Sequence, residues 1–215
     1  MTNAYEDEGV TAEASLLEDE SFVRGVQAAT QVLRRTFFRP NVLFLNMERN
    51  NLADMQVLAD GTAAYSMAVI LLTRHPIMNM GREKHINVWI SHQSPEWQFD
   101  EHATNLDMMI LAAIQLARNW NGRITLCMSI IDPTERLQAT TYLENVITLA
   151  RLPQSTNMVI LDGAFYDVLA EAPAADLSIF GLAHDAKLEF TQKIFGLVDA
   201  SCIFVRDSGV ESAFA

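Results

Sequence analysis

Polar side chains that could do chemistry follow several expected strands, at the edge where ligands bind in open parallel sheets. These residues are Asn46, Ser91, His92, Asp132, Asp162, His184 and Asp207. Asp132, Asp162 and Asp207 could meet as a carboxylate cluster for Mg²⁺, or one of them could act as an acid or base. Asp132 is equally explained as a helix cap, and Asp162, next to Gly163, as part of a turn. We therefore expect neither a metal ion nor a catalytic residue there.

A second group of candidate ligands falls within one polar loop. His92, Asp100, Glu101 and His102 carry the imidazole and carboxylate groups that bind Zn²⁺, but their spacing matches neither H-x-x-H nor H-E-x-x-H. Ser91 beside His92 lacks the flanking glycines of a G-x-S-x-G nucleophile elbow. The sequence thus offers no combination of nucleophile, base and oxyanion site, and predicts a protein that is not an enzyme.

The spacing of the glycines excludes the common phosphate-binding loops. Such loops place glycines close together, so that backbone N–H groups can approach the anion. The chain has nine glycines, and no two of them are nearer than 13 positions. This spacing rules out the G-x-G-x-x-G fingerprint, the P-loop and the Gly-x-x-Gly spacing of nucleotide-binding stress proteins. We expect no cofactor.

Charge and hydropathy limit the partners. The net charge is −12, and seven acidic residues precede the first basic one, Arg24; the remainder carries 20 acidic and 15 basic side chains. The sequence has no stripe of basic residues that could bind the phosphates of nucleic acid, and an anionic membrane surface would repel the chain. The longest apolar run, residues 108–114, is far shorter than the roughly 18 residues of a membrane span, so we expect no membrane insertion. Cys127 and Cys202 each lie within an apolar segment expected to be a strand, and they do not form a disulfide framework. This pattern indicates a reducing, cytoplasmic setting.

Residues 85–131 contain the unit that must position these side chains. Two short, uncharged, β-branched segments, 86–90 and 124–131, are typical of strands covered on both faces. Residues 106–120 between them repeat apolar groups at helical spacing, with Asn105 placed to cap the start and Gly122 suited to the left-handed end. Strand, helix and strand form one βαβ crossover, which indicates an α/β fold.

The same patterns predict the other elements. Strands are expected at 41–46, 67–73, 157–161, 177–180 and 201–205, and helices at 22–37, 51–65, 133–150, 165–171 and 185–198. Residues 132–135 form a capping box that begins the third of these helices, and Asp185 is expected to cap the last. The chain is thus predicted to be an α/β protein with a doubly wound, mostly parallel sheet and helices on both faces. Residues 1–18 are expected to be an acidic tail or the end of a preceding unit, and residues 19–215 a single domain.

Several segments, in order, resemble the cytoplasmic carboxyl-terminal domain of cation-chloride cotransporters. They are Arg39-Pro-Asn-Val-Leu-Phe-Leu-Asn46 and residues 64–72, 86–90, 121–126, 175–180 and 205–206. The resemblance covers roughly residues 22–215, departing from the family in the loop 91–97 and at Asn46 and Met47. It implies paired universal-stress-protein-like α/β units that dimerise, lie below the transport helices and regulate transport of Na⁺, K⁺ and Cl⁻. The chain looks like the second unit and its leading helix, from a prokaryotic member.

We therefore expect a non-enzymatic regulatory and dimerisation domain on the cytoplasmic side of the membrane. Its expected partners are a second copy and the transmembrane transport domain of the same polypeptide. The helix 106–120 carries more apolar residues than one buried face needs. The candidate dimer interface is accordingly Leu106, Met108, Met109, Leu111 and Gln115. The alternatives are a universal-stress-protein-like nucleotide-binding protein, a small α/β enzyme, or an unrelated interaction module.

Overall fold

The computed structural model describes residues 12, 14, 16–37, 39–91, 93, 96–97 and 105–214. The chain divides into two compact units, Met1–Pro40 and Asn41–Ala215. The first unit contains the helix α2 (Phe22–Leu33), whose first turn is capped by the Ser21 hydroxyl, which accepts a hydrogen bond from the Arg24 N–H. This helix is shorter than predicted.

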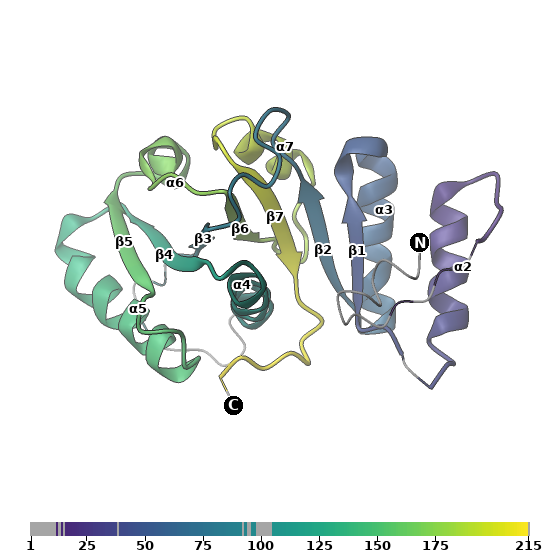
Figure 1. Ribbon diagram of the computed structural model, residues 1–215, viewed down its shortest axis with the longest axis horizontal. Coiled ribbons are helices and arrows are strands. Elements are labelled where there is room, and N and C mark those ends of the chain that lie inside the picture. Colours follow the sequence, from purple (N-terminus) through teal and green to yellow (C-terminus); the bar gives the residue numbers. More distant parts are fainter. Residues whose placement is uncertain are drawn as a thin grey trace. The chain divides into compact units, whose positions relative to one another are not determined.

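The second unit is built on a seven-stranded sheet (Figure 1). Its strands are β1 (Val42–Asn46), β2 (Ala68–Thr73), β3 (His85–Trp89), β4 (Arg123–Ile130), β5 (Asn157–Asp162), β6 (Leu177–Gly181) and β7 (Ser201–Arg206). Their order across the sheet is β1-β2-β7-β6-β3-β4-β5. All neighbours are parallel except β2 and β7, which pair antiparallel. The predicted α/β class with a mostly parallel sheet is confirmed.

Helices cover both faces of this sheet. They are α3 (Leu52–Thr62), α4 (Leu106–Trp120), α5 (Arg136–Leu149), α6 (Phe165–Val168) and α7 (Glu189–Phe195), and short 3₁₀ turns lie at Met47–Arg49, Ala63–Tyr65, Pro133–Glu135 and Leu169–Glu171. In Figure 1, α4 and α5 lie on one side of the sheet, with α6 and α7 on the opposite side. This arrangement follows because the crossovers β3–α4–β4 and β4–α5–β5 run one way across the sheet, whereas β5–α6–β6 and β6–α7–β7 run the other way.

Alternation along β3 explains how both faces become buried. Ile86 and Val88 belong to the core cluster that includes α4, whereas Trp89 contacts the rings of Phe165 and Phe180 on the opposite face. Both faces of the strand are buried because a helix layer covers each of them.

Three local predictions were wrong about helix ends. Asn105 does begin α4, but it adopts a left-handed conformation (φ 73°) and its side chain makes no cap hydrogen bond. At the other end of α4 the left-handed residue is Asn121 (φ 47°), not Gly122. Asp185 does not cap the last helix, which begins at Glu189 after Leu188. Backbone geometry at helix ends is set by tertiary contacts as well as by residue type.

Within the described residues, none of the helices is long and apolar enough to cross a membrane.

Candidate functional site: a cleft where the strand order reverses

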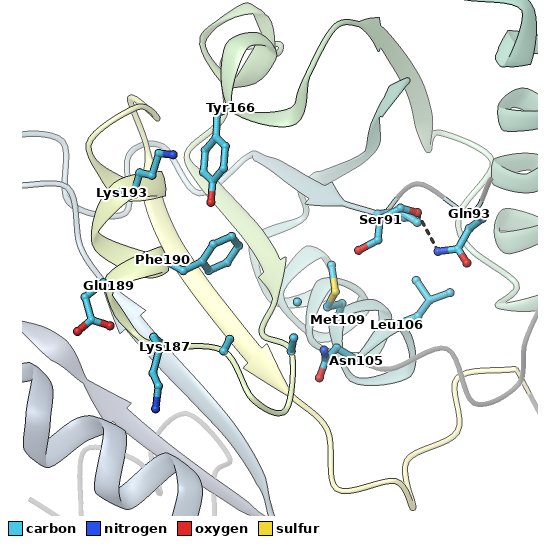
Figure 2. Close-up of a pocket in the computed structure, with 14 residues that line it drawn as sticks. Ser91, Gln93, Asn105, Leu106, Met109, Tyr166, Lys187, Glu189, Phe190 and Lys193 are labelled. Carbon is cyan, nitrogen blue, oxygen red and sulfur yellow. Dashed lines mark hydrogen bonds between the residues drawn. The ribbon is translucent and has the colours of Figure 1, made fainter. Parts of the chain in front are cut away.

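The order of the strands reverses between β3 and β6, where ligands commonly bind in doubly wound sheets. β3 continues to β4 on one side, whereas β6 and β7 follow on the other, so the connections diverge and leave a crevice beyond the carboxyl ends. A cleft of about 830 Å³ lies there (Figure 2). It is bordered by the end of β3, the start of α4, and the segments around α6 and α7.

Gly181, the last residue of β6, allows the start of α4 to approach the sheet at this cleft. A Cβ atom at Gly181 would lie 3.2 Å from the Met109 Sδ atom and 3.3 Å from the Asn105 Cβ atom. The Asn105 side chain then holds the helix start, because its Nδ2 donates to the Leu182 carbonyl (3.1 Å) and its Oδ1 accepts from the Asp207 N–H (3.0 Å). The floor of the cleft is thus fixed to the ends of β6 and β7.

Polar and aromatic side chains together border the cleft. Figure 2 shows the Tyr166 hydroxyl and the Phe190 ring directed toward the cavity from one side and Ser91 on the other, with Lys187 directed away. Lys193 Nζ lies 3.5 Å from the centroid of the Tyr166 ring, a cation–π contact at the rim. The lysine charges therefore lie at the edge of the cleft rather than in its centre.

A smaller, aromatic recess adjoins the cleft. Its volume is about 290 Å³, and its lining includes Trp89, Ser129, Phe165, Phe180 and Phe190. Ile90, Ser91, Gly181 and Phe190 line both cavities, so the recess opens into the cleft. The Trp89 ring stacks on Phe180 (centroids 6.0 Å apart) and meets Phe165 edge-on (5.6 Å).

Trp89 carries an unpaired donor. The residue is 4% exposed, and its Nε1–H finds no hydrogen-bond partner among the residues that the structure describes. A buried donor without a partner costs free energy, and such groups are rare in native proteins. Trp89 is therefore a core residue with a hydrogen-bonding capacity that the described part of the fold leaves unused.

The acidic residues at the strand ends are held by separate partners. Asp132 accepts from the Thr134 N–H at 2.9 Å, which lowers the pKa of its carboxyl group; it caps the 3₁₀ turn Pro133–Glu135 that leads into α5, whereas α5 itself begins at Arg136 without a side-chain cap. Asp162 forms an ion pair with Arg136 at 2.7 Å, and Asp207 accepts from the Asn105 N–H. Within the described ranges, no group of three or more His, Cys, Asp or Glu side chains could hold a metal ion.

The other candidate residues from the sequence contribute little to the cleft. Of the strand-end candidates, Ser91 is exposed in the lining of the cleft, Asn46 caps a 3₁₀ turn by accepting from the Glu48 N–H, and His184 is exposed. The proposed metal ligands His92, Asp100, Glu101 and His102 lie outside the described residues. Burial raises the pKa of both cysteine thiols, Cys127 and Cys202, to about 12, so both are protonated at neutral pH and unsuited to nucleophilic attack.

The five residues of the candidate dimer interface differ in burial. Leu106, Met108 and Met109 are at most 8% exposed and belong to the core of this chain, so their side chains have little surface for a partner. Leu111 is 37% exposed, and Gln115 is also exposed. Of the five residues, only Leu111 and Gln115 have side chains exposed enough to contact a second copy. The interface stays a prediction.

Sequence reasoning missed the residues that shape the cleft, namely Tyr166, Phe190 and Lys193. These residues follow β5 and β6, strands that are not adjacent in the sheet. The aromatic pair Phe165-Tyr166 at the start of a short helix was the available signal. Without the order of strands, it could not be connected with Trp89.

The fold is that of universal stress proteins. The chain is similar in structure to a putative universal stress protein from Pseudomonas aeruginosa UCBPP-PA14 (11% identity, TM-score 0.57), covering 94% of this chain and 74% of that one. It is similar also to a universal stress protein from Archaeoglobus fulgidus DSM 4304 (12% identity, TM-score 0.55), covering 96% and 73%. At these identities the likeness defines a class of fold, a doubly wound α/β module.

Sequence models define the family. A model of the second C-terminal domain of prokaryotic cation-chloride cotransporters matches residues 81–214, and a model of the first C-terminal domain matches residues 1–80. The chain belongs to this family of C-terminal domains. It is similar to a crystal structure described as the cytoplasmic domain of a prokaryotic cation chloride cotransporter (26% identity, TM-score 0.88), covering 99% of this chain and 80% of that one. Comparison with curated protein sequences gives no match.

The family match explains the antiparallel pairing of β2 with β7. β1 and β2 lie in the residues matched by the first-domain model, and β3 to β7 in those matched by the second. The β2–β7 pair is therefore where the two matched regions join in one sheet. The resemblance was correct about the family, and the match to the first domain extends further than the leading helix that it identified.

Proposed function

We propose that the chain is a non-enzymatic regulatory domain on the cytoplasmic side of the membrane, joined to the transport domain of the same polypeptide. The observation that carries this proposal is the TM-score of 0.88 over 99% of the chain to a cytoplasmic domain of this transporter family. The transported ions would be Na⁺, K⁺ and Cl⁻, and the domain would act through its surfaces. A homodimer, with Leu111 and Gln115 of α4 at its interface, belongs to the same proposal.

Deleting residues 41–215 from the transporter that carries them tests regulation directly. We expect the transport helices to reach the membrane in similar amount, measured by surface labelling, because the seven-stranded sheet forms its own core. Chloride-dependent rubidium uptake per inserted molecule should change, because regulatory input is lost. Unchanged uptake at equal membrane abundance would contradict a regulatory role.

Nucleotide binding, as in a universal-stress-protein-like nucleotide binder, is the second candidate. The cleft at the reversal of strand order favours it, whereas the wide spacing of the glycines opposes a phosphate cradle. Calorimetry with Mg²⁺–ATP and with adenosine separates the two proposals. A heat of binding seen with Mg²⁺–ATP but not with adenosine would favour nucleotide binding. The regulatory proposal expects the phosphates to add no heat of binding.

A further inference from the structure

A separate cavity with polar side chains lies near the amino-terminal ends of β3 and β6. Its volume is about 260 Å³, and its lining includes Asn87 of β3 and Ser178 of β6. Residues from the segments 169–175 and 197–200 supply most of the remaining lining. Neither Asn87 nor Ser178 lines the cleft or the aromatic recess, so these two side chains do not belong to the site at the carboxyl ends of the strands.

Both polar side chains are buried with an oxygen atom that has no partner. Asn87 is 3% exposed and Ser178 is 1% exposed. Asn87 Nδ2 donates to the Pro173 carbonyl at 2.7 Å. Because a carbonyl oxygen can only accept, this bond fixes the orientation of the amide and identifies Oδ1 as the free acceptor. Among the described residues, neither Asn87 Oδ1 nor Ser178 Oγ has a hydrogen-bond partner.

These two oxygens are open to the cavity and close to each other. The unpaired buried atoms that lack accessible surface do not include them, so each keeps some surface, and the cavity is where both residues have it. Asn87 lies directly opposite Ser178 in the parallel pair of β3 and β6. Side chains opposite each other on neighbouring strands project from the same face about 5 Å apart. One bound atom between them would therefore contact both oxygens.

The charge and the ligand types favour a monovalent metal cation. Among the described residues that line the cavity, Asp199 is the only charged one, and it pairs with His75 at 3.1 Å. Mg²⁺ and Ca²⁺ sites need carboxylates as direct ligands, whereas neutral oxygen atoms also bind Na⁺ and K⁺. At about 30 Å³ for each water molecule, the cavity has room for an ion that keeps part of its hydration shell.

We propose that Asn87 Oδ1 and Ser178 Oγ bind a partly hydrated monovalent metal cation, Na⁺ or K⁺. The bound ion satisfies two buried acceptors that the fold leaves without partners. This assignment rests on the proposed function, because it gives a domain that regulates cation transport a site at which the cation itself is sensed.

The cavity adjoins the loop that connects the two regions matched by the family models. Residues 197–200 line the cavity, and Ser201 follows them directly. Ser201 Oγ accepts from the His75 N–H at 2.8 Å and donates to the Asn79 carbonyl, and both of these residues lie between β2 and β3. A cation that orders the segment 197–200 therefore also acts on this loop.

The first test compares urea unfolding of the chain in KCl, NaCl and N-methyl-D-glucamine chloride at equal total chloride. With a Kd of about 50 mM, about 200 mM of the bound cation should lower the equilibrium constant for unfolding about fivefold relative to N-methyl-D-glucamine. The metal salt that gives the lower constant identifies the preferred cation. Equal unfolding in all three salts would overturn the proposal.

Two serine variants locate the effect. Ser178→Ala removes one ligand and should reduce the difference between the salts to less than about twofold. Ser129→Ala is the matched control, because it makes the same change in β4, in the lining of the aromatic recess, and should keep the full difference. A difference that survives Ser178→Ala, or that both variants lose equally, would contradict the assignment.

A nuclear magnetic resonance titration of the unaltered chain needs no variant to fold. The Asn87 side-chain NH₂ signals should move along a saturating curve as the preferred cation replaces N-methyl-D-glucamine, with the midpoint found by unfolding. The side-chain signals of Asn121, which lies at the other end of α4 outside the cavity, should not follow this curve. Asn87 signals that do not saturate would contradict the site. Neither measurement involves ion transport, so a failure here leaves the regulatory proposal to its own experiment.

Discussion

At the scale of single residues, Asp176 fixes the loop that leads into the second half of the sheet. Its carboxylate accepts hydrogen bonds from the N–H groups of Arg82 (2.9 Å), Lys84 (2.8 Å) and His85 (2.9 Å). Gly81 adopts a left-handed φ of +61°, and a Cβ there would lie 2.2 Å from the Asp176 Oδ1 atom. Only glycine allows the loop to wrap around this carboxylate without strain.

Replacing Asp176 with asparagine should destabilise the protein by about 1–3 kcal/mol at pH 7, because an NH₂ group would face backbone donors. Partial burial alone would raise the pKa of Asp176, but the three N–H bonds outweigh it and hold the pKa below its ordinary value. The contribution to stability is therefore complete above pH of about 4 and is lost as the pH falls through the lowered pKa. Urea unfolding of both proteins at neutral and acidic pH should show the difference shrinking with acid.

Asp199→Asn is the matched control for this substitution. Asp199 pairs with His75 at 3.1 Å, but its side chain is 89% exposed, so the pair should contribute little. A loss in Asp199→Asn equal to that in Asp176→Asn would show that the backbone bonds to Asp176 are not the cause.

At the scale of elements, the antiparallel junction between β2 and β7 is secured by a buried arginine. Arg206, at the end of β7, is 3% exposed; it donates to the Ala59 carbonyl in α3 (3.2 Å) and to the Ala183 carbonyl beyond β6 (3.4 Å). It also lies 3.3 Å from the Asp60 carboxylate. One side chain therefore links the region matched by the first-domain model to that matched by the second.

Arg206→Met should lower the free energy of unfolding by about 1–3 kcal/mol, because this buried side chain loses its hydrogen bonds to the Ala59 and Ala183 carbonyls and its contact with the half-exposed Asp60 carboxylate. The measurement is the midpoint of urea unfolding at constant slope. Arg136→Met is the control, since its pair with Asp162 is about half exposed and should contribute under about 1 kcal/mol. Similar losses in both variants would mean that the junction does not depend on Arg206.

At the scale of the whole molecule, the open question is association. Of the α4 residues predicted to form a dimer, Leu111 and Gln115 are exposed while the others fill the core. If this face joins two copies, Leu111→Lys should shift the mass toward the monomer, because a charge would be buried without a partner. Light scattering over a range of concentrations measures the change.

Leu137→Lys provides the comparison, because Leu137 is a more exposed leucine on a different helix, α5. It should leave the mass unchanged. A wild-type chain that stays monomeric at high concentration would end the dimer proposal without affecting the fold.

The sequence by itself determined the elements and the family. Strand and helix positions follow from local periodicity, so α4 was predicted with its observed bounds and each of the seven strands within about one residue. The ordered motifs identified the cotransporter domain, which the family models then confirmed. Helix ends were less predictable, because Asn105 binds Asp207 and Leu182 instead of its own helix.

Only the tertiary structure decided the strand order, the antiparallel β2–β7 pair and the cleft. These features depend on contacts between residues far apart in the chain, such as Trp89 with Phe165 and Phe180 or Arg206 with Ala59. Periodicity reports which face of a strand is buried, but it carries no information about which strand lies beside it. The unpaired Trp89 donor could not be predicted for the same reason, since the lack of a hydrogen-bond partner among the described residues is recognised only from their positions in space.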